Sequence, residues 1–486
     1  MLFATLALAA ALVDLGSFHA LEHGDSIVPV LVSLQRWTPF YWDQERYGML
    51  VPLVALPVRD PLWNLILQRG LLVLSGLAAV VLVARHVLAG RDWPLAGAVA
   101  AGGLLALAPA PWLFEYLGDQ PYGLSLALAL SGLALAEPRP APSGEGARRP
   151  LPRLALALLL VVLAHWVNAA TGILLAALAA ARAGVDLLEG EPARRVRARL
   201  AGDGALLAAG LVAGQAFLRL YVALTGRPLR LDLGPLPPAA WPHAWGAFLG
   251  NAWRDASAWG AILAAGAAAG AALLALRPLR PHLAPALLRA GALLAAALVY
   301  ALFAGSLRWV EANAFHWRYL APSAVLVHVA AAALLAEPLG RLPRLARAAG
   351  LTALALVPAA ALLAYGAPSP ARVRADLDAV AGRHTEDVLA AGCQLVAGDY
   401  WSVWPAVLHA ALVSRERGAP RPVFGLSHRA NPTVPSWAGV PREELRICRP
   451  AGEEAQAERW LRAFHVWPVR SVERRPTLDV LVLAAP

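Results

Sequence analysis

Carboxylate side chains collect near the start of an otherwise acid-poor chain. Residues 17–61 hold five of its 32 acidic residues, and Asp25, Asp43 and Glu45 among them stand beside Trp, Tyr and Phe residues. A positioned carboxylate can take the proton from an attacking hydroxyl or amine group. The segment is therefore a candidate for general-base catalysis by one of these three acids. The alternative interpretation is an aromatic belt at a membrane surface with solvated charges around it.

A second set of polar residues lies at the ends of apolar segments. Glu115 and Asp119 stand in the short connection PWLFEYLGDQPYG, and His165 opens the segment HWVNAATG. Carboxylates at a helix end can bind a divalent metal, orient an acceptor or remain solvated, and a lone His more often bridges helices. We expect these three residues to position an acceptor or a metal. Whether a metal is needed at all stays open, and no metal site is predicted.

Arginine residues supply candidate phosphate ligands. Arg69 interrupts the apolar run LWNLILQRGLLVLSGLAAV, and Arg318 and Tyr319 begin another run at RYLAP. A charge inside a membrane span is costly and is a functional hypothesis by default, and the planar fork of a guanidinium matches two phosphate oxygens. We expect Arg69, Arg318 and Tyr319 to bind a phosphate group. Arg219, near the end of a further run, can instead extend its charged head to the interface.

Motifs for several enzyme classes are absent or out of context. The residues His19 to His23 match H-x-x-E-H, a zinc-protease signature. They follow an apolar segment, run directly into Gly24 and have no downstream ligand motif, so we do not expect a metalloprotease. The chain also contains no G-x-x-x-x-G-K-[ST], no G-x-S-x-G and no C-x-x-C. Their absence argues against an ATPase, an α/β-hydrolase and a thiol redox protein.

The composition explains what must position these residues. Of the 486 residues, 59% are hydrophobic and 15% are charged, and the mean hydropathy is +0.55. Soluble domains are about 45–50% apolar and about 25% charged, so an ordinary soluble enzyme and a disordered chain are excluded. The net charge is +10 and every basic residue is Arg, a bias that does not form a nucleic-acid surface. The expected partner is the lipid bilayer, and not a nucleic acid.

Apolar runs of about 20 residues predict membrane spans. We expect about eleven, at 1–16, 62–83, 94–112, 120–136, 153–167, 168–183, 203–223, 257–276, 288–306, 319–336 and 348–366. The fold class is therefore mainly α, a polytopic transmembrane helical bundle with a small C-terminal α/β domain outside the membrane. The domain boundaries are 1–366 for the transmembrane part and 367–486 for the extracytoplasmic part.

The C-terminal residues alternate between strand and helix patterns. CQLVAG, PVFGLS, ELRICR and LDVLVLA are typical of strands, and WPAVLHAALVSRERG and residues 452–464 are typical of helices. Cys393 and Cys448 are the chain's only cysteines, and each stands in one of these strand patterns. Strands of one sheet can bring Cα atoms within the bonding range of about 4.4–6.8 Å. We predict a disulfide between them, with two separate buried thiols as the alternative.

This layout resembles the GT-C glycosyltransferases, which are polytopic enzymes that use polyprenyl-phosphate sugars. The similarity lies in an acid after the first span in EHGDS, an aromatic first loop that ends in RYGMLVPL, a short acidic second loop in FEYLGDQ, RYLAP at a late span, and a soluble C-terminal domain. The resemblance covers most of the membrane region, although the paired acidic doublet expected after the first span is only Asp25 followed by Ser26.

The resemblance implies a chemistry for these residues. A polyprenyl-phosphate-linked sugar would be the donor, a carboxylate such as Asp25 the general base, and an Arg the ligand of the departing phosphate. A multi-pass protein of the bacterial cytoplasmic (inner) membrane is implied, acting at its outer face with a periplasmic C-terminal domain; some relatives need a divalent metal. Two rivals are a transporter or flippase of envelope lipids or glycans, which favours charges near the bilayer midplane, and a non-catalytic assembly protein.

The placement of Arg predicts the topology. Alternating loops carry 17 Arg on one side and 8 on the other, and the Arg-rich side faces the cytoplasm. With eleven spans, the N-terminus lies inside and residues from about 367 onward lie outside. A topology reporter fused after Pro486 should therefore be active only outside the cytoplasm. Activity of that fusion in the cytoplasm alone would show that this orientation is wrong.

Overall fold

The structure is a computed structural model, and it describes most of the chain. The described residues are 1–44, 47–88, 93–137, 151–226, 234–255, 265–266, 269–270, 283–441, 444–466 and 469–483. The chain divides into two compact units. Unit 1 contains Met1–Val13 and Leu72–Gly366, and unit 2 contains Asp14–Leu71 and Ala367–Pro486. The segment after the first helix therefore belongs with the C-terminal residues.

Helices at ten of the eleven predicted spans are present in the described part of the chain. They are α1 (Leu2–Asp14), α4 (Pro61–Leu88), α5 (Trp93–Leu107), α7 (Tyr122–Ala136), α8 (Leu151–Val167), α9 (Thr171–Leu188), α10 (Ala193–Thr225), α13 (Leu283–Gly305), α15 (Ala321–Gly340) and α16 (Pro343–Tyr365). The remaining prediction, 257–276, falls almost wholly outside the described residues. The predicted polytopic helical architecture is confirmed.

Length and apolar composition identify the membrane-crossing helices. Six described helices are long and apolar enough to span a bilayer: Pro61–Leu88, Thr171–Leu188, Ala193–Thr225, Ala284–Gly305, Trp317–Gly340 and Pro343–Tyr365. Apolar helices of 10–17 residues, including α1, α5, α7 and α8, accompany them. The chain is therefore a multi-pass membrane protein.

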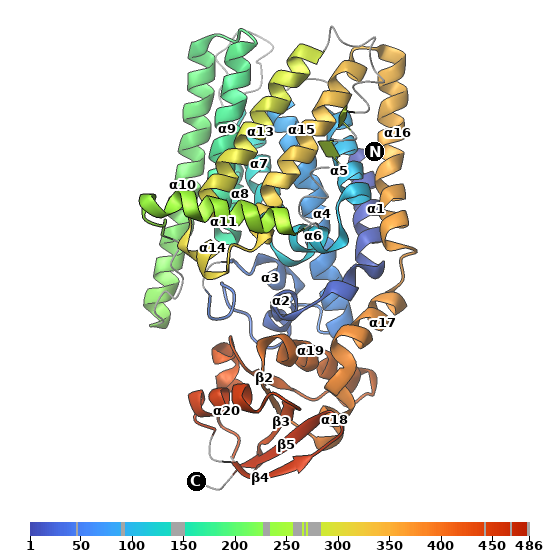
Figure 1. Ribbon diagram of the computed structural model, residues 1–486, viewed down its shortest axis with the longest axis vertical. Helices are drawn as coiled ribbons and strands as arrows, with labels where there is room; N and C mark the ends of the chain where they lie inside the picture. The colour runs from blue at the N-terminus through green and yellow to red at the C-terminus, as the bar shows by residue number, and fades with distance from the viewer. Residues whose placement is uncertain are drawn as a thin grey trace. The chain divides into compact units, whose positions relative to one another are not determined.

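Unit 1 is a bundle in which neighbouring helices pack closely. α13 lies against α15 and α9, α7 against α8, and α5 against α16 and α15 (Figure 1). At Gly132 of α7, an added Cβ atom would lie 2.8 Å from the backbone oxygen of Ala157 in α8. Small residues allow membrane helices to approach in this way. The smaller elements of the unit are α6 (Ala110–Leu113), η2 (Phe114–Asp119), η3 (Pro238–Ala240), α11 (Trp241–Arg254), α14 (Arg308–Ala312) and η5 (Trp317–Leu320).

The first part of unit 2 contains residues 17–61, the acid-rich segment, which has more regular structure than its sequence suggested. It forms η1 (Ser17–Leu21), α2 (Gly24–Leu34) and α3 (Leu50–Ala55), with a bridge between Phe40 and Gly48. The helices α17 (Pro370–Ala381), η6 (Gly382–His384) and α18 (Thr385–Ala391) open the C-terminal part. α2 packs on α19 (Tyr400–Glu416), and η1 packs on α17. These contacts join the two sequence-distant parts of unit 2.

A five-stranded sheet with helices on both faces completes unit 2. The strands are β1 (Leu395–Ala397), β2 (Phe424–Leu426), β3 (Arg446–Pro450), β4 (Val469–Arg474) and β5 (Leu478–Leu483), in the order β2-β1-β3-β5-β4. β1 pairs in parallel with β2 and β3, and β5 runs antiparallel to β3 and β4. The sequence predicted four of these strands and the helices α19 and α20 (Glu454–Ala463); it missed β4, whose residues are mostly exposed. η7 (Asn431–Ser436) follows β2.

The alternation of side chains along the strands builds two cores. Val396, Cys448 and Val480 join one buried cluster with residues of α19 and α2. Leu395 and Ile447 join the other cluster with residues of α20. Successive side chains of a strand point to opposite faces, so each short apolar strand supplies both clusters. The predicted C-terminal α/β fold is therefore present, and α19 connects it to the acid-rich segment.

The predicted disulfide is confirmed. Cys393 and Cys448 are bonded, with their Cα atoms 5.8 Å apart and a sequence separation of 55 residues. Leu395 and Val396 of β1 pair with Ile447 and Cys448 of β3, and Cys393 lies two residues before β1.

Removal of this disulfide should destabilise unit 2 without altering the fold. In the chain-entropy model, a closed loop of this length contributes about 4 kcal/mol. We expect the double variant Cys393→Ala, Cys448→Ala to unfold at a lower temperature than the wild type, and a reductant to lower the midpoint of the wild type only. Labelling of two thiols in the denatured, unreduced wild type would contradict the bond.

Candidate functional site

A buried network of charged side chains links the segment between α1 and α2 to α4. Arg69 is fully buried, and its Nε and Nη2 atoms donate to Glu22 Oε1 and Oε2 at 2.6 and 2.9 Å. Nη2 also donates to the backbone oxygen of Ser26, whose hydroxyl donates to Glu22 Oε2 at 2.5 Å. The His19 ring lies 3.1 Å from Glu22 Oε1 and 2.6 Å from the backbone oxygen of Asp14. Arg69 therefore uses its fork on a carboxylate of its own chain.

The network favours the charged forms of His19 and Glu22. Burial alone would lower the pKa of His19, but its hydrogen bonds to Asp14 and Glu22 and the charges of both raise that pKa to about 9. Burial likewise opposes ionisation of Glu22, yet the charge of Arg69 and the hydrogen bonds from His19 and Arg69 hold its pKa below the ordinary value. His19 and Glu22 of the H-x-x-E-H pattern thus belong to an internal salt-bridge network.

Asp25 lies beside this network and is accessible. It is half-buried in the first turn of α2, where His23 precedes the helix and its backbone N–H donates to the Ser26 hydroxyl at 2.9 Å. Tyr400 OH donates to Asp25 Oδ1 at 2.6 Å, and Tyr41 OH donates to the Asp25 backbone oxygen at 3.0 Å. A partly exposed carboxylate at a helix N-terminus, fixed by phenol groups, is suited to proton transfer.

The local structure around Tyr400 explains how it reaches Asp25. Asp399 caps α19 by accepting from the Trp401 backbone N–H at 2.9 Å, so that Tyr400 begins the helix. Gly24 permits the close approach, because an added Cβ atom there would lie 2.8 Å from the Tyr400 ring and 3.1 Å from its backbone oxygen. Burial, with the charge of Asp25 adding to it, raises the pKa of Tyr400, so the phenol keeps the proton it donates.

Asp43 holds the loop that follows β2. Its Oδ2 atom accepts from the Asn431 side chain at 2.8 Å and from the Asn431 backbone N–H at 3.3 Å. Beside Asn431 stands Arg429, whose Nη1 donates to the backbone oxygen of Trp42 at 3.3 Å. Asp43 is therefore placed to position a loop, and its predicted role as a base stays untested. Glu45, the third predicted acid, lies outside the described residues.

Glu115 and Asp119 lie in unit 1, on the single π-helical turn η2. They present carboxylate oxygens within 4.8 Å of one another. Asp119 Oδ2 accepts from Gln120, and Asp119 Oδ1 is buried without a hydrogen-bond partner among the described residues. Two carboxylates at this spacing fit an oxygen-ligated divalent cation, although such a cation needs several further ligands.

His165 and the late arginine also belong to unit 1. The His165 ring is buried at the end of α8, and an added Cβ at Gly172 of α9 would lie 2.8 Å from its Cε1 atom. This contact fits a histidine that packs between helices. Arg318 lies over the Tyr319 ring at 5.2 Å and donates to Asn313 Oδ1 at 3.2 Å, at the turn η5 before α15. Because Asp25 and Arg69 belong to unit 2, the predicted residues divide between the units.

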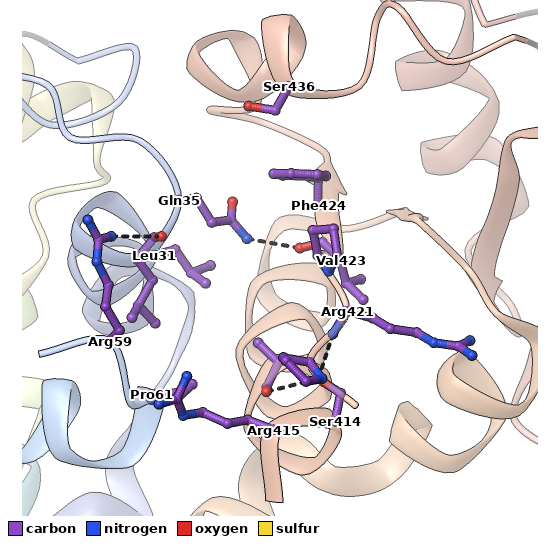
Figure 2. Close-up of a pocket in the computed structure, with 14 residues that line it drawn as sticks. Leu31, Gln35, Arg59, Pro61, Ser414, Arg415, Arg421, Val423, Phe424 and Ser436 are labelled. Atoms are coloured by element: carbon purple, nitrogen blue, oxygen red, sulfur yellow. Dashed lines mark hydrogen bonds between the residues drawn. The ribbon is translucent and has the colours of Figure 1, made fainter. Parts of the chain in front are cut away.

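A cavity of about 400 Å³ lies elsewhere in unit 2 (Figure 2). Gln35 of the acid-rich segment crosses to the backbone oxygen of Val423 at 2.9 Å, and Arg415 pairs with Asp60 at 3.3 Å on its rim. The walls are mostly apolar, and none of the predicted site residues lines it. The cluster around Asp25, which includes Tyr41 and Tyr400, is therefore separate from this cavity.

No protein-family model matches the chain, and no curated protein sequence matches it. The solved structures include matches, and the fold that they define is that of the GT-C glycosyltransferases. One of these structures is ArnT from Cupriavidus metallidurans bound to undecaprenyl phosphate, 12% identical, with a TM-score of 0.53 over 99% of this chain and 97% of that one. The apo state of the same protein covers 100% and 97% at 12% identity and a TM-score of 0.46.

The likeness establishes the fold over nearly the full length of both chains. The GT-C resemblance predicted from short motifs is therefore confirmed at the level of the fold. Sequence reasoning missed two residues of the cluster, Tyr400 and Arg429. Tyr400 stands in GDYWSVWP and Arg429 in GLSHRANP, and neither segment contains a catalytic motif. A capped Tyr at a helix start and a lone Arg in a polar loop were the available signals.

Removal of one partner of the buried pair should destabilise the protein strongly. Either Glu22→Gln or Arg69→Gln leaves an unpaired buried charge, which costs about 3–5 kcal/mol. Glu22 contributes stability above about pH 4.5, lost as the pH falls, and His19 contributes it fully below about pH 6.5, lost as the pH rises through about 9. We expect the wild-type thermal midpoint in detergent to drop at both extremes, and that of Glu22→Gln to be low throughout.

The exposed pair of Arg417 and Glu386 in the same unit serves as the control. Exposed ion pairs contribute about 0–1 kcal/mol, so Glu386→Gln should move the midpoint little. Equal shifts for Glu22→Gln and Glu386→Gln would show that the buried network does not stabilise the unit.

Proposed function

We propose that the protein is a membrane glycosyltransferase that moves a sugar from a polyprenyl-phosphate donor to an acceptor, with Asp25 as the general base. The observation that carries the proposal is the position of Asp25, a half-buried carboxylate held by Tyr400 in the first turn of α2, in a chain with a GT-C fold. The neighbouring ArnT structure contains undecaprenyl phosphate, which supports a lipid phosphate as the carrier of the sugar.

The proposed reaction exchanges one C–O bond for a bond to the acceptor. The acceptor hydroxyl or amine attacks the anomeric carbon, and Asp25 takes its proton. The bond from the anomeric carbon to the phosphate oxygen breaks, and polyprenyl phosphate leaves with the electron pair. Attack from the face opposite the phosphate inverts the anomeric centre. The leaving group already carries the phosphate, so no nucleotide site is required.

The remaining predicted residues receive supporting roles in this proposal. We assign acceptor positioning to Glu115, Asp119 and His165, and a divalent cation at the two carboxylates would polarise the acceptor if the protein uses one. Arg318 and Tyr319 remain candidates for donor contacts at the start of α15. We do not assign Arg69 to phosphate here, because Glu22 and Ser26 occupy its Nε and Nη2 donors.

We place the reaction at the outer face of the cytoplasmic membrane, with residues 367–486 in the periplasm and residues 1–366 as the transmembrane part. The distribution of Arg between loops supports this orientation. A disulfide in the C-terminal residues supports it as well, since such bonds persist outside the cytoplasm. The sugar and the acceptor, whether lipid, glycan or protein, follow from comparison of the envelope glycans of wild-type and deletion strains by mass spectrometry.

Asp25→Asn tests the base directly. Loss of a positioned general base lowers the rate by about 10²–10⁴-fold, and Asn keeps the size of the side chain and an acceptor for Tyr400. We expect the turnover of sugar from the lipid donor in membranes to fall by that factor at an unchanged thermal midpoint. The control is Asp60→Asn, an acid of the same segment that caps α4 through the Trp63 backbone N–H. Near-normal turnover by Asp25→Asn would reject the base and direct attention to Asp43, Glu45 or Glu115.

A further inference from the structure

Arg429 carries a buried positive charge that no carboxylate of the described residues balances. Its residue is 7% exposed, and no carboxylate of the described residues lies within 4.0 Å of it. Its single hydrogen bond to a described residue runs from Nη1 to the backbone oxygen of Trp42. Nε is buried without a partner among those residues. An unpaired buried charge is costly unless an anion or other acceptors satisfy it.

Two tyrosine rings flank this guanidinium group, but they accept no hydrogen bond from its N–H groups. Arg429 Cζ lies 5.1 Å from the ring centroid of Tyr41 and 5.8 Å from that of Tyr400. Cation–π attraction stabilises the charge across the ring faces, whereas the N–H groups lie in the plane of the guanidinium. Both phenol groups meanwhile donate to Asp25. Both tyrosine side chains therefore lie between Arg429 and Asp25, and that of Tyr400 contacts the Asp25 carboxylate directly.

The backbone of Arg429 is held in a strained conformation. Its φ of +80° lies in the left-handed region that favours glycine. The neighbouring residues fix the loop: Trp404 Nε1 donates to the His428 backbone oxygen at 3.2 Å, and Asn431 donates to Asp43 at 2.8 Å. Strain of this kind persists where the surroundings over-determine it, and it concentrates at ligand sites. The loop thus presents Arg429 at a fixed position beside Asp25.

We infer that Arg429 binds the phosphate group of the lipid donor, a deepening that rests on the function proposed above. A phosphate oxygen satisfies the free donors of the guanidinium and balances its charge. The same contact stabilises the charge that gathers on the phosphate as the bond to the sugar breaks. Residues 367–486 then supply part of the active site: Arg429 touches the donor, and Tyr400 is a positioning residue for Asp25. A lipid phosphate and free phosphate share this chemistry.

The test measures binding apart from turnover. Purified full-length protein in detergent is titrated with farnesyl phosphate, and farnesol serves as the probe without phosphate. Loss of a hydrogen bond to a charged group costs about 10- to 100-fold in affinity, so we expect this loss for Arg429→Gln with farnesyl phosphate and no loss with farnesol. Arg429→Lys should lie between, since it keeps the charge without the fork. Competition by inorganic phosphate shows whether the phosphate alone suffices or the lipid is also needed.

Matched variants separate this inference from the proposed function. Arg421→Gln removes an exposed arginine of the same unit and should change neither affinity. Tyr400→Phe and Asp25→Asn should keep farnesyl phosphate binding within about twofold while turnover falls, because neither change removes Arg429. Normal turnover by Asp25→Asn together with lost binding by Arg429→Gln would reject the base and retain the phosphate site. Wild-type affinity for farnesyl phosphate in Arg429→Gln or Arg429→Lys, at a retained thermal midpoint, would overturn the inference.

Discussion

The ion pair between Glu22 and Arg69 is the constraint on which the candidate site depends. Two charges that are both fully buried must remain paired, since separation would leave each of them in a low-dielectric environment. Arg69 stands on α4 and Glu22 precedes α2, so the pair fixes where the chain returns after its first helix. The bond from Arg69 to the Ser26 backbone oxygen fixes the residue directly after Asp25. The position of the proposed base thus follows from electrostatics several residues away.

The second consequence is the union of the acid-rich segment with the C-terminal residues. Polar contacts with the loop after β2 come from several points along the segment: Asp43 binds Asn431, the Trp42 backbone oxygen binds Arg429, and Arg36 Nη1 donates to the Pro432 backbone oxygen at 3.0 Å. α2 and α19 share a buried apolar cluster beneath them. A domain that follows the last span in the sequence therefore contributes directly to the surroundings of Asp25.

The two acids of EHGDS show how one short motif divides into two roles. Both are separated from the first apolar run by a few residues, and neither composition nor spacing distinguishes them. Glu22 accepts from Arg69, Ser26 and His19 in full burial, whereas Asp25 stays half-buried at the start of a helix and accepts from a phenol. Burial and partners, which are properties of the folded chain, make one acid structural and leave the other available for proton transfer.

The sequence by itself determined the membrane class, the positions of ten helices and four of the five strands. These features depend on composition and on the period of apolar residues within about 20 positions, which a single chain displays directly. The sequence did not predict β4, because its mostly exposed residues show no alternation of apolar and polar side chains. Only the tertiary structure decided that Arg69 pairs with Glu22. It alone also placed Tyr400 against Asp25 and Arg429 against the Tyr400 ring. The hydrogen bond between Tyr400 and Asp25 joins residues 375 positions apart, and a contact at that separation is set by how the helices and the sheet pack, which no local pattern encodes.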